Sequence, residues 1–458
     1  MIDENIRRLE SGESFSQLDK DVIEIIKKTI DAISPKKVIV RIAGGWVRDK
    51  IMGRENDDID IAISGATCNE FSDAMVSVLG PNTKRVLLEA NHEQLKHIDT
   101  ARVCLFHDFW LDICSLRSAL YSEGEKLEGT AVSAALHRDF SMNAIFFNVQ
   151  TMKIEDYVNG VQSIKDKIIR TPIPAMQDFT DDPNRIIRCF RFVAKYDFKI
   201  DPQIYEAIPK IIPLFMRNIA KDRVATELIK LMHSDSSFLA LENLINSGML
   251  NPVFDPESLW SLDKEETLKR IRRAHQIEPN LEGENKMILY FAAIFLPLVD
   301  KDTIPDPAKK NKFTSAVHYA IVRAMKLQNV LADNVKKIHL GFSLVEAIYK
   351  GELNRVTGGR FVMSVGPLYK LVRPLLMDDE LLKFYDEKLN PFIVAEKLEK
   401  SYEMKQLMDG VSLANIYGVK PGPVLKDLIE EMINWQLSNP NRSSDDYKKY
   451  ILENKKQK

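Results

Sequence analysis

One stretch near the N-terminus constrains the fold of this chain more than any other. The run Val38–Ile42 is short, apolar and rich in β-branched residues, which favours a buried strand over a helix. Gly44 and Gly45 follow it, and a turn of two glycines can adopt positive φ and let an anion approach main-chain N–H groups. We expect a helix to begin near Trp46, with Arg48 aimed at the same anion. The sequence therefore predicts a phosphate cradle, with a plain turn as the alternative.

Two carboxylates follow in a second apolar segment. Asp58 and Asp60 are one residue apart, and side chains at positions i and i+2 of a strand lie on the same face. Both carboxylates would then point to one side while Ile59, Ile61 and Ile63 pack inward. Adjacent carboxylates repel each other unless a cation lies between them, and such oxygen ligands suit Mg²⁺ bound with substrate phosphates. A solvated strand face is the alternative, but the preceding glycine turn favours a metal site.

Residues 181–192 predict a helix that carries a row of arginines. Pro183 suits the first turn of such a helix. The polar face consists of Asp182, Arg185, Arg188 and Arg191. The apolar face consists of Ile186, Ile187 and Phe190. Closely spaced arginines repel one another unless an anion lies over them, so the pattern favours a bound triphosphate over a merely solvated face.

Residues 41–63 resemble the first motif of the nucleotidyltransferase superfamily typified by DNA polymerase β. More narrowly, they look like the class II tRNA nucleotidyltransferases, which add CCA to tRNA 3′ ends, and residues 97–116 and 417–426 look like the eukaryotic type of that family. Residues 138–144 are similar to that family's Arg-Arg-Asp-Phe-Thr-Ile-Asn-Ala pattern, with His137 in place of the first arginine. The resemblance implies that Arg138 contacts the bound nucleotide. From the residues alone, an ion pair on a surface turn is the alternative.

In the family that the chain resembles, the helix with the arginine row selects the base. The resemblance implies that Asp182 and Arg185 pair with the base and that Arg188 and Arg191 contact the nucleotide. The Arg185 guanidinium can donate to the ring-nitrogen acceptor of cytosine or adenine, while the Asp182 carboxylate can accept from the exocyclic amine. Guanine and uracil carry a hydrogen on that ring nitrogen. Each buried group left unpaired costs about 1–3 kcal/mol, so these bases would be rejected.

Asp112 lies in an alternating segment, residues 109–117, that predicts another strand. Superfamily members often hold a third acid on a later strand, so the resemblance implies that Asp112 deprotonates the attacking hydroxyl or completes a metal shell. The polar stretch 122–130 looks like the family's flexible loop between catalytic strands. Shortly after it, Ser133 and Ala134 stand where the family usually has an acidic pair, which is a departure from the pattern.

Length and pattern predict an α+β protein of several domains. A chain of 458 residues exceeds what one hydrophobic core usually organises. After Phe146 the strand-like alternation gives way to amphipathic helical segments such as 263–275, 286–295 and 425–436. With the resemblance, we expect a polymerase-β-like nucleotidyltransferase head with a mixed sheet and helices, followed by an all-α neck, body and tail. The expected bounds are 1–155, 156–235, 236–330 and 331–458, and the tail would bind tRNA.

Composition limits the partners and the compartment. The net charge of −2 means that any RNA binding must use local basic patches. The four cysteines lack Cys-x-x-Cys spacing, which argues against structural zinc or a disulfide framework and fits a reducing compartment. No apolar run reaches the roughly 18 residues of a membrane-spanning helix, and the N-terminus is rich in acids. We expect a cytoplasmic or nuclear protein with no membrane partner and no evident mitochondrial targeting.

The resulting hypothesis is a Mg²⁺-dependent, template-independent nucleotidyl transfer. The 3′-hydroxyl of tRNA would attack the α-phosphorus of CTP or ATP, with metal at Asp58 and Asp60, and pyrophosphate would leave. Two alternatives stay open, a poly(A) polymerase of the same superfamily and a non-catalytic tRNA-binding protein on a decayed fold. The departures at His137, Ser133 and Ala134 motivate the second alternative. The sequence leaves open the oligomeric state and whether one enzyme adds all three nucleotides.

Overall fold

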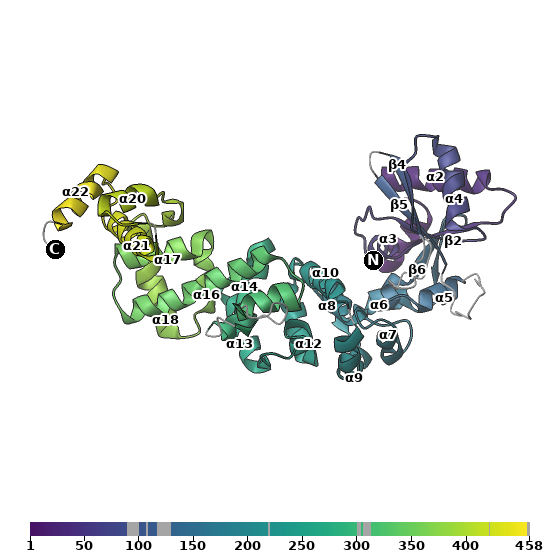
Figure 1. Ribbon diagram of the computed structural model, residues 1–458. Coiled ribbons are helices and arrows are strands. Elements are labelled where there is room, and N and C mark those ends of the chain that lie inside the picture. The colour runs from purple at the N-terminus through teal and green to yellow at the C-terminus, as the bar shows by residue number, and fades with distance from the viewer. Residues whose placement is uncertain are drawn as a thin grey trace. The chain divides into compact units, whose positions relative to one another are not determined.

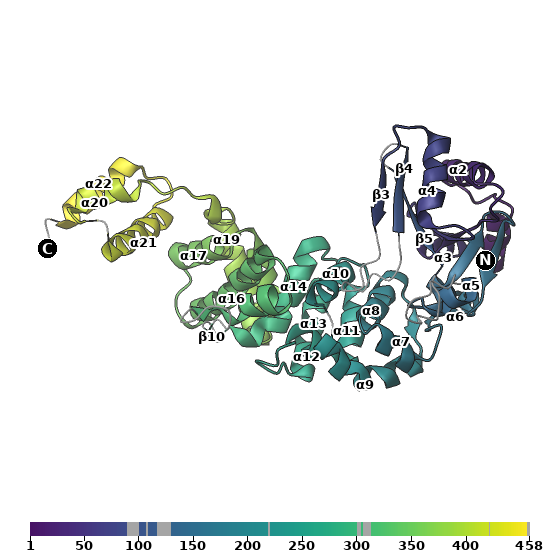
Figure 2. The same ribbon diagram turned by 45° about the vertical axis from the view of Figure 1, so that its right-hand side comes forward.

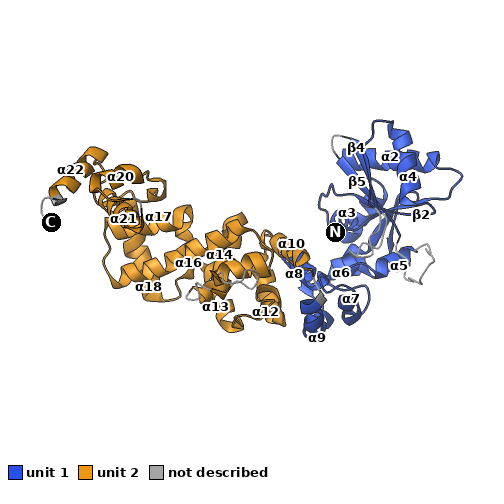
Figure 3. Cartoon of the chain, viewed as in Figure 1, with its two compact units in different colours: residues 1–219 blue, residues 220–458 orange. Residues whose placement is uncertain are grey.

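The computed structural model describes residues 1–88, 100–106, 109–116, 130–218, 220–299, 304–305, 313–420 and 422–455. The chain divides into two compact units, residues 1–219 and 220–458 (Figure 3). This boundary falls inside the range 156–235 expected to form the neck, and the division into four parts stays a prediction. The loop expected at 122–130 lies outside the described residues except for Thr130.

A seven-stranded sheet forms the centre of the first unit, in the order β3-β4-β5-β2-β1-β6-β7 (Figures 1 and 2). The strands are β1 (Ile39–Ala43), β2 (Asp60–Ser64), β3 (Arg85–Leu88), β4 (Thr100–Phe106), β5 (Phe109–Ser115), β6 (Ile145–Asn148) and β7 (Lys153–Asp156). β2 and β5 run parallel, whereas the other neighbours pair antiparallel. The predicted mixed sheet is thereby confirmed. The central strand β1 is buried on both faces, because Val40 and Ile42 are fully inaccessible on one face and Arg41 and Ala43 are buried on the other.

Helices cover this sheet and connect its strands. They are α1 (Ile2–Glu10), α2 (Gln17–Ala32), α3 (Gly45–Ile51), α4 (Cys68–Leu79), α5 (Ala131–Leu136) and α6 (Gly160–Asp166). α4 packs against β3, β4 and β5, and α2 packs in turn against α4 (Figure 1). On β1 and β6, α3 is held by an aromatic cluster in which the rings of Trp46 and Phe147 lie 5.8 Å apart between centroids.

Three helices complete the first unit, α7 (Ala175–Asp181), α8 (Arg185–Tyr196) and α9 (Pro202–Asn218). The apolar face predicted for the arginine helix is buried, since Ile186, Ile187 and Phe190 are fully inaccessible. The helix begins later than expected, because Asp182 lies in the turn before α8. Its Oδ1 accepts a hydrogen bond from the backbone N–H of Asn184 at 3.1 Å, and such local bonds compete with helix formation. Asp182 therefore precedes the arginine face instead of sharing it.

The second unit is almost entirely helical. Its α-helices are α10 (Lys221–Met232), α11 (Ser237–Leu244), α12 (Leu250–Phe254), α13 (Lys264–Ile277), α14 (Gly283–Phe295), α15 (Ala316–His318), α16 (Asn329–Lys350), α17 (Arg355–Val365), α18 (Asp379–Phe384), α19 (Asn390–Ala395), α20 (Gly410–Tyr417), α21 (Pro423–Ser438) and α22 (Ser444–Lys455). The helices predicted at 263–275, 286–295 and 425–436 are confirmed by α13, α14 and α21. Residues 286–295 of α14 are all buried, so this helix is central instead of amphipathic.

Two short ribbons depart from the all-α expectation after residue 155. β8 (Ile168–Ile169) pairs parallel with β9 (Lys199–Ile200), and β10 (Ile304–Pro305) pairs antiparallel with β11 (Phe313–Thr314). Each strand has only two residues, too short to give an alternating pattern in the sequence. Within the described ranges, no helix is long and apolar enough to cross a membrane.

Candidate active site

The glycine turn joins β1 to α3 in the backbone conformation that the sequence predicted. Gly44 has φ +76°, a region that residues with a side chain rarely adopt. A Cβ on Gly44 would lie 2.8 Å from Nη1 of Arg138, which is closer than real Cβ atoms come to other atoms. A Cβ on Gly45 would lie 3.2 Å from Nδ2 of Asn56. Because Gly44 has no Cβ, the Arg138 side chain, the predicted nucleotide contact, can lie directly against the backbone of the turn.

The predicted carboxylates lie at the same end of the sheet as this turn. Asp60 opens β2 and is the register partner of Ala43, the residue that precedes Gly44. Asp58 is exposed two residues earlier, and the isoleucine between the two acids is buried, as the alternation predicted. On its other side Asp60 is the register partner of Asp112 on the parallel strand β5. The register of β2 thus brings the three predicted acids to one end of the sheet, beside the glycine turn.

The electrostatics of this edge favour a cation. Burial raises the pKa of Asp60 to about 6, and the neighbouring carboxylates Asp58 and Asp112 contribute to the rise, while Arg138 and Arg102 oppose it. The described part of the chain contains no group of three His, Cys, Asp or Glu side chains placed to hold a metal ion. Mg²⁺ needs only one or two protein carboxylates when substrate phosphates supply further oxygens. The oxygen donors of Asp58 and Asp60 fit such an ion.

Asp112 has a cationic partner in this structure. Nε of Arg102 donates a hydrogen bond to its Oδ1 at 2.5 Å, and both side chains are more than two-fifths exposed. The Arg102 guanidinium also lies over the ring of Trp110, 5.6 Å from its centroid. The position beside Asp60 agrees with the expected third acid. The catalytic role of Asp112 stays a prediction.

Arg48 occupies a different environment from the one expected. Its guanidinium is buried, with Nε and Nη2 donating to Asp49 at 2.8 and 2.9 Å and Nη1 donating to Oδ1 of Asn143 at 2.5 Å. The ring of Tyr196 on α8 lies beneath it at 4.7 Å. We expected Arg48 to face a phosphate, but the carboxylate of the next residue, Asp49, binds its guanidinium through both oxygens instead. Arg48 connects α3 to α8.

Arg138 lies beside the glycine turn and acts electrostatically on Asp60. Its guanidinium lies over the ring of Phe146 on β6, 5.5 Å from the centroid, and Phe146 is the register partner of Ala43. It is also one of the cations that lower the pKa of Asp60. A cation there could contact phosphate oxygens bound between the glycine turn and the carboxylates.

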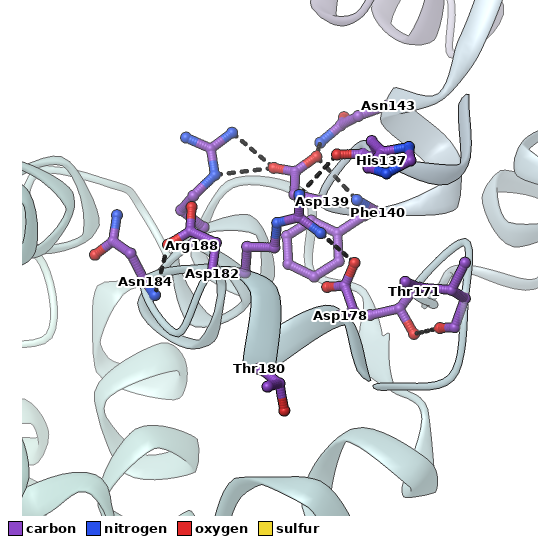
Figure 4. Close-up of polar contacts among 12 residues, drawn as sticks. His137, Asp139, Phe140, Asn143, Thr171, Asp178, Thr180, Asp182, Asn184 and Arg188 are labelled. Atoms are coloured by element: carbon purple, nitrogen blue, oxygen red, sulfur yellow. Dashed lines mark hydrogen bonds and ion pairs between the residues drawn. The ribbon is translucent and has the colours of Figure 1, made fainter. Parts of the chain in front are cut away.

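The next residue, Asp139, forms an ion pair with Arg188, the middle arginine of the row. Its Oδ2 accepts hydrogen bonds from Nε and Nη2 of Arg188 at 2.9 and 2.6 Å, and its Oδ1 accepts from Nδ2 of Asn143 at 2.9 Å (Figure 4). Burial alone would raise the pKa of Asp139, but Arg188 and these hydrogen bonds hold it below its usual value. The residues that hold α8 in place thus include an acid that the sequence reasoning did not select.

Arg185 is likewise anchored at the start of α8. It is 8% exposed, its Nη2 donates to the main-chain oxygen of His137 at 2.7 Å, and its Nη1 forms an ion pair with Oδ1 of Asp178 on α7. The third arginine of the row, Arg191, is half-buried with its guanidinium over the ring of Phe192, 4.3 Å from the centroid. The repulsion expected within the arginine row is therefore relieved partly by internal carboxylates.

Sequence reasoning missed Asp178 and the structural role of Asp139. The only sequence signal for Asp178 was that an acid lies a few residues before the arginine row. Its pairing with Arg185 could not be predicted from that signal, because the pairing depends on how α7 packs. The departures from the family pattern also have local explanations. Ser133 completes a capping box with Thr130 at the start of α5, and Ala134 is buried in an alanine-rich cluster with Ala135. An acid at position 134 would be buried there.

Comparison with known proteins agrees with this arrangement. Residues 40–170 match the family described as poly A polymerase head domain, and residues 197–259 match the probable RNA and SrmB-binding site of polymerase A. A tRNA nucleotidyltransferase of Schizosaccharomyces pombe is 29% identical over 95% of this chain and 98% of its own length. The mitochondrial CCA tRNA nucleotidyltransferase of Candida glabrata is 28% identical over 90% of each chain. The Thermotoga maritima CCA-adding enzyme, solved in complex with tRNA, shares the fold with a TM-score of 0.68 over 98% of each chain at 16% identity.

Proposed function

We propose that the chain is a tRNA nucleotidyltransferase of the polymerase β superfamily and that it adds CCA to the 3′ end of tRNA from CTP and ATP without a nucleic-acid template, as its likeness to tRNA nucleotidyltransferases over nearly its whole length indicates. The observation that carries the proposal is the meeting of three features at one end of the sheet. They are the Gly44 turn, the acids Asp58 and Asp60, and Arg138 beside the turn.

We propose that Asp58 and Asp60 hold Mg²⁺, in a family whose members are generally dependent on divalent metal. When bound, the metal would stabilise the negative charge that develops on the attacking and leaving oxygens. The raised pKa of Asp60 supports this assignment, because a partly buried acid beside two other carboxylates favours a nearby cation.

The protein's own residues would position the reacting groups. The main chain at Gly44 and Gly45 and the guanidinium of Arg138 would bind the triphosphate, so that its α-phosphorus faces the tRNA 3′-hydroxyl. Asp112 would accept the proton of that hydroxyl as the new phosphodiester forms and pyrophosphate leaves. Arg48 would act indirectly, since its bonds to Asp49 and Asn143 fix the helix that follows the turn.

Base selection would take place at the start of α8. We propose that Arg185 donates to the ring nitrogen of cytosine or adenine and that Asp182 accepts from the exocyclic amine. Arg188 and Arg191 would contact the nucleotide on the same face of the helix. Asp182 can take this role although it lies in the turn before α8. The Arg185 N–H donates a hydrogen bond to the Asp182 carbonyl at 3.1 Å, which keeps the two residues close together.

The second unit would bind the body of the tRNA. We propose the sequence-based division into head, neck, body and tail as a working description, with the head in the first unit. Relatives of this chain include mitochondrial enzymes, and a cytoplasmic or nuclear location is the proposal for this protein.

The test is incorporation of labelled nucleotides into tRNA that lacks its 3′ CCA, resolved at single-nucleotide length. We expect two additions with CTP alone, a stop at three with CTP and ATP, and no addition when the metal is chelated. An open-ended ladder with ATP alone would instead identify a poly(A) polymerase, the activity named in the matching head family. Binding of tRNA without any turnover would identify a non-catalytic protein.

A further inference from the structure

Arg185 is held from two sides before any base is present. Its Nη2 donates to the main-chain oxygen of His137, and its Nη1 pairs with Oδ1 of Asp178. Both side chains are buried, with the Asp178 side chain fully inaccessible and the Arg185 side chain 10% exposed. A guanidinium carries its five N–H donors in one plane, so anchoring both terminal nitrogens fixes the directions in which the remaining donors point.

We propose that Asp178 is a positioning residue for base selection, which holds the Arg185 guanidinium in the plane that accepts cytosine and adenine and opposes uracil and guanine. This inference rests on the proposed function of Arg185. The contact with His137 comes from the main chain, so it survives any change of that side chain. Asp178 is therefore the anchor that depends on residue type.

Loss of this anchor would affect selectivity more than turnover. Held only by the His137 carbonyl, the guanidinium could turn about that one contact and move its N–H away from the N–H of a wrong base. The wrong base would then be penalised less, whereas a correct base could still accept a hydrogen bond. Preorganisation of this kind distinguishes a specificity role from a simple counter-ion role.

The surroundings of Asp178 add a pH dependence. Among the described residues, its Oδ2 is buried without a hydrogen-bond partner, which makes it the atom that takes up a proton. Burial raises the pKa of Asp178 to about 7 although Arg185 opposes the rise, and the carboxylates Asp139 and Asp181 add to it. Below this pH the carboxyl becomes neutral and its hold on Arg185 weakens.

Among the residues that the structure describes, few other titratable groups lie around the Asp178 carboxyl. From α8 the buried thiol of Cys189 is the further titratable neighbour, and burial raises its pKa so that it stays neutral. The charged residues of α9, which also packs against α7, are exposed; they are Glu206, Lys210 and Arg217. The pH dependence is therefore assigned to Asp178 and its pair with Arg185.

The experiment compares kcat/KM for CTP and for UTP at the first addition to tRNA lacking CCA, in the full-length protein. For Asp178→Ala we expect the CTP-to-UTP ratio to fall about tenfold, with a smaller loss of kcat for CTP. For Asp178→Asn we expect a smaller fall, because the amide oxygen can still accept from Nη1. The matched control is Asp166→Asn, which weakens an ion pair with Arg170 elsewhere in the same unit.

The pH profile supplies the second readout. The wild-type ratio should decline as the pH is lowered from about 8 to about 6, and the ratio of Asp178→Asn should stay flat across that range. A folded Asp178→Ala variant with the wild-type ratio would overturn the proposal, and so would a wild-type ratio that is independent of pH. If the alanine variant unfolds, the asparagine variant and the wild-type pH profile decide the question.

Failure of the proposed function would look different. In that case the wild-type protein itself would not add two cytidines to the truncated tRNA. Equilibrium binding of CTP and UTP to the wild type and to Asp178→Ala would then test the inference without any turnover, with the same expected change in ratio. Equal selectivity of the two proteins in that assay would overturn it.

Discussion

Asp60 and Asp112 are register partners on the parallel neighbours β2 and β5, and Asp60 also lies opposite the residue that precedes the glycine turn. Asp60 therefore has two neighbours of different chemistry. On one side is a backbone turn that can approach phosphate, and on the other is a second carboxylate paired with Arg102. The register of β2 therefore determines how the reacting groups would meet.

Replacing Asp60 should separate chemistry from RNA binding. Asp60→Ala removes one of the two carboxylates assigned to Mg²⁺, and we expect nucleotide incorporation to fall about a thousandfold or more. Binding of tRNA should change little, as measured by filter binding on the same preparation. Asp57→Ala, an exposed acid nearby, is the control and should behave as wild type. Equal loss of binding and incorporation in Asp60→Ala would indicate misfolding.

The role of Asp112 can be separated from its ion pair. If it accepts the proton of the hydroxyl, Asp112→Ala should lower kcat by about a hundredfold or more. Arg102→Ala breaks the same exposed ion pair, which should contribute at most about 1 kcal/mol to stability, and should leave kcat near that of wild type. Near wild-type turnover in Asp112→Ala would exclude the proton-accepting role.

A methyl group at the glycine turn should weaken nucleotide binding. In Gly44→Ala the new Cβ would meet Nη1 of Arg138, so we expect KM for CTP to rise about tenfold or more. Gly80→Ala is the matched control, because Gly80 also has positive φ but a Cβ there would meet no atom within 4 Å. Both variants bear the cost of an unfavourable φ, about 1 kcal/mol, which thermal unfolding measures. An equal rise of KM in both variants would contradict the role of the turn.

Acid stability should depend on Asp139. Its pKa is lower in the folded protein than the value of about 3.9 in an unfolded chain, so the carboxylate stabilises the fold above that pH. This contribution is lost as the pH falls through the folded-state pKa. Asp139→Asn should lower the free energy of unfolding by about 2 kcal/mol at neutral pH, and the difference from wild type should shrink below about pH 4. Denaturant unfolding at several pH values measures both effects, and a difference that is constant with pH would refute the assignment.

Much of the first unit could be predicted because its signals are local. The strand at 39–43 follows from β-branched residues, the turn follows from Gly44, and the burial of Ile59 and Ile61 follows from strict alternation. The helical remainder follows from the amphipathic segments after Phe146, and the resemblance supplied the mixed sheet. The environment of Arg48 was not predictable in the same way, because its partner Asn143 is 95 residues away along the chain.

The sequence by itself determined which chemistry is available, since residue types and short spacings produce the glycine turn, the paired acids and the arginine row. Only the tertiary structure decided how those groups are oriented. It paired Asp139 with Arg188 and Asp178 with Arg185, and it placed Asp182 in a turn before the helix. The physical reason is that buried charges are stable only with partners, and those partners come from segments that local patterns do not connect.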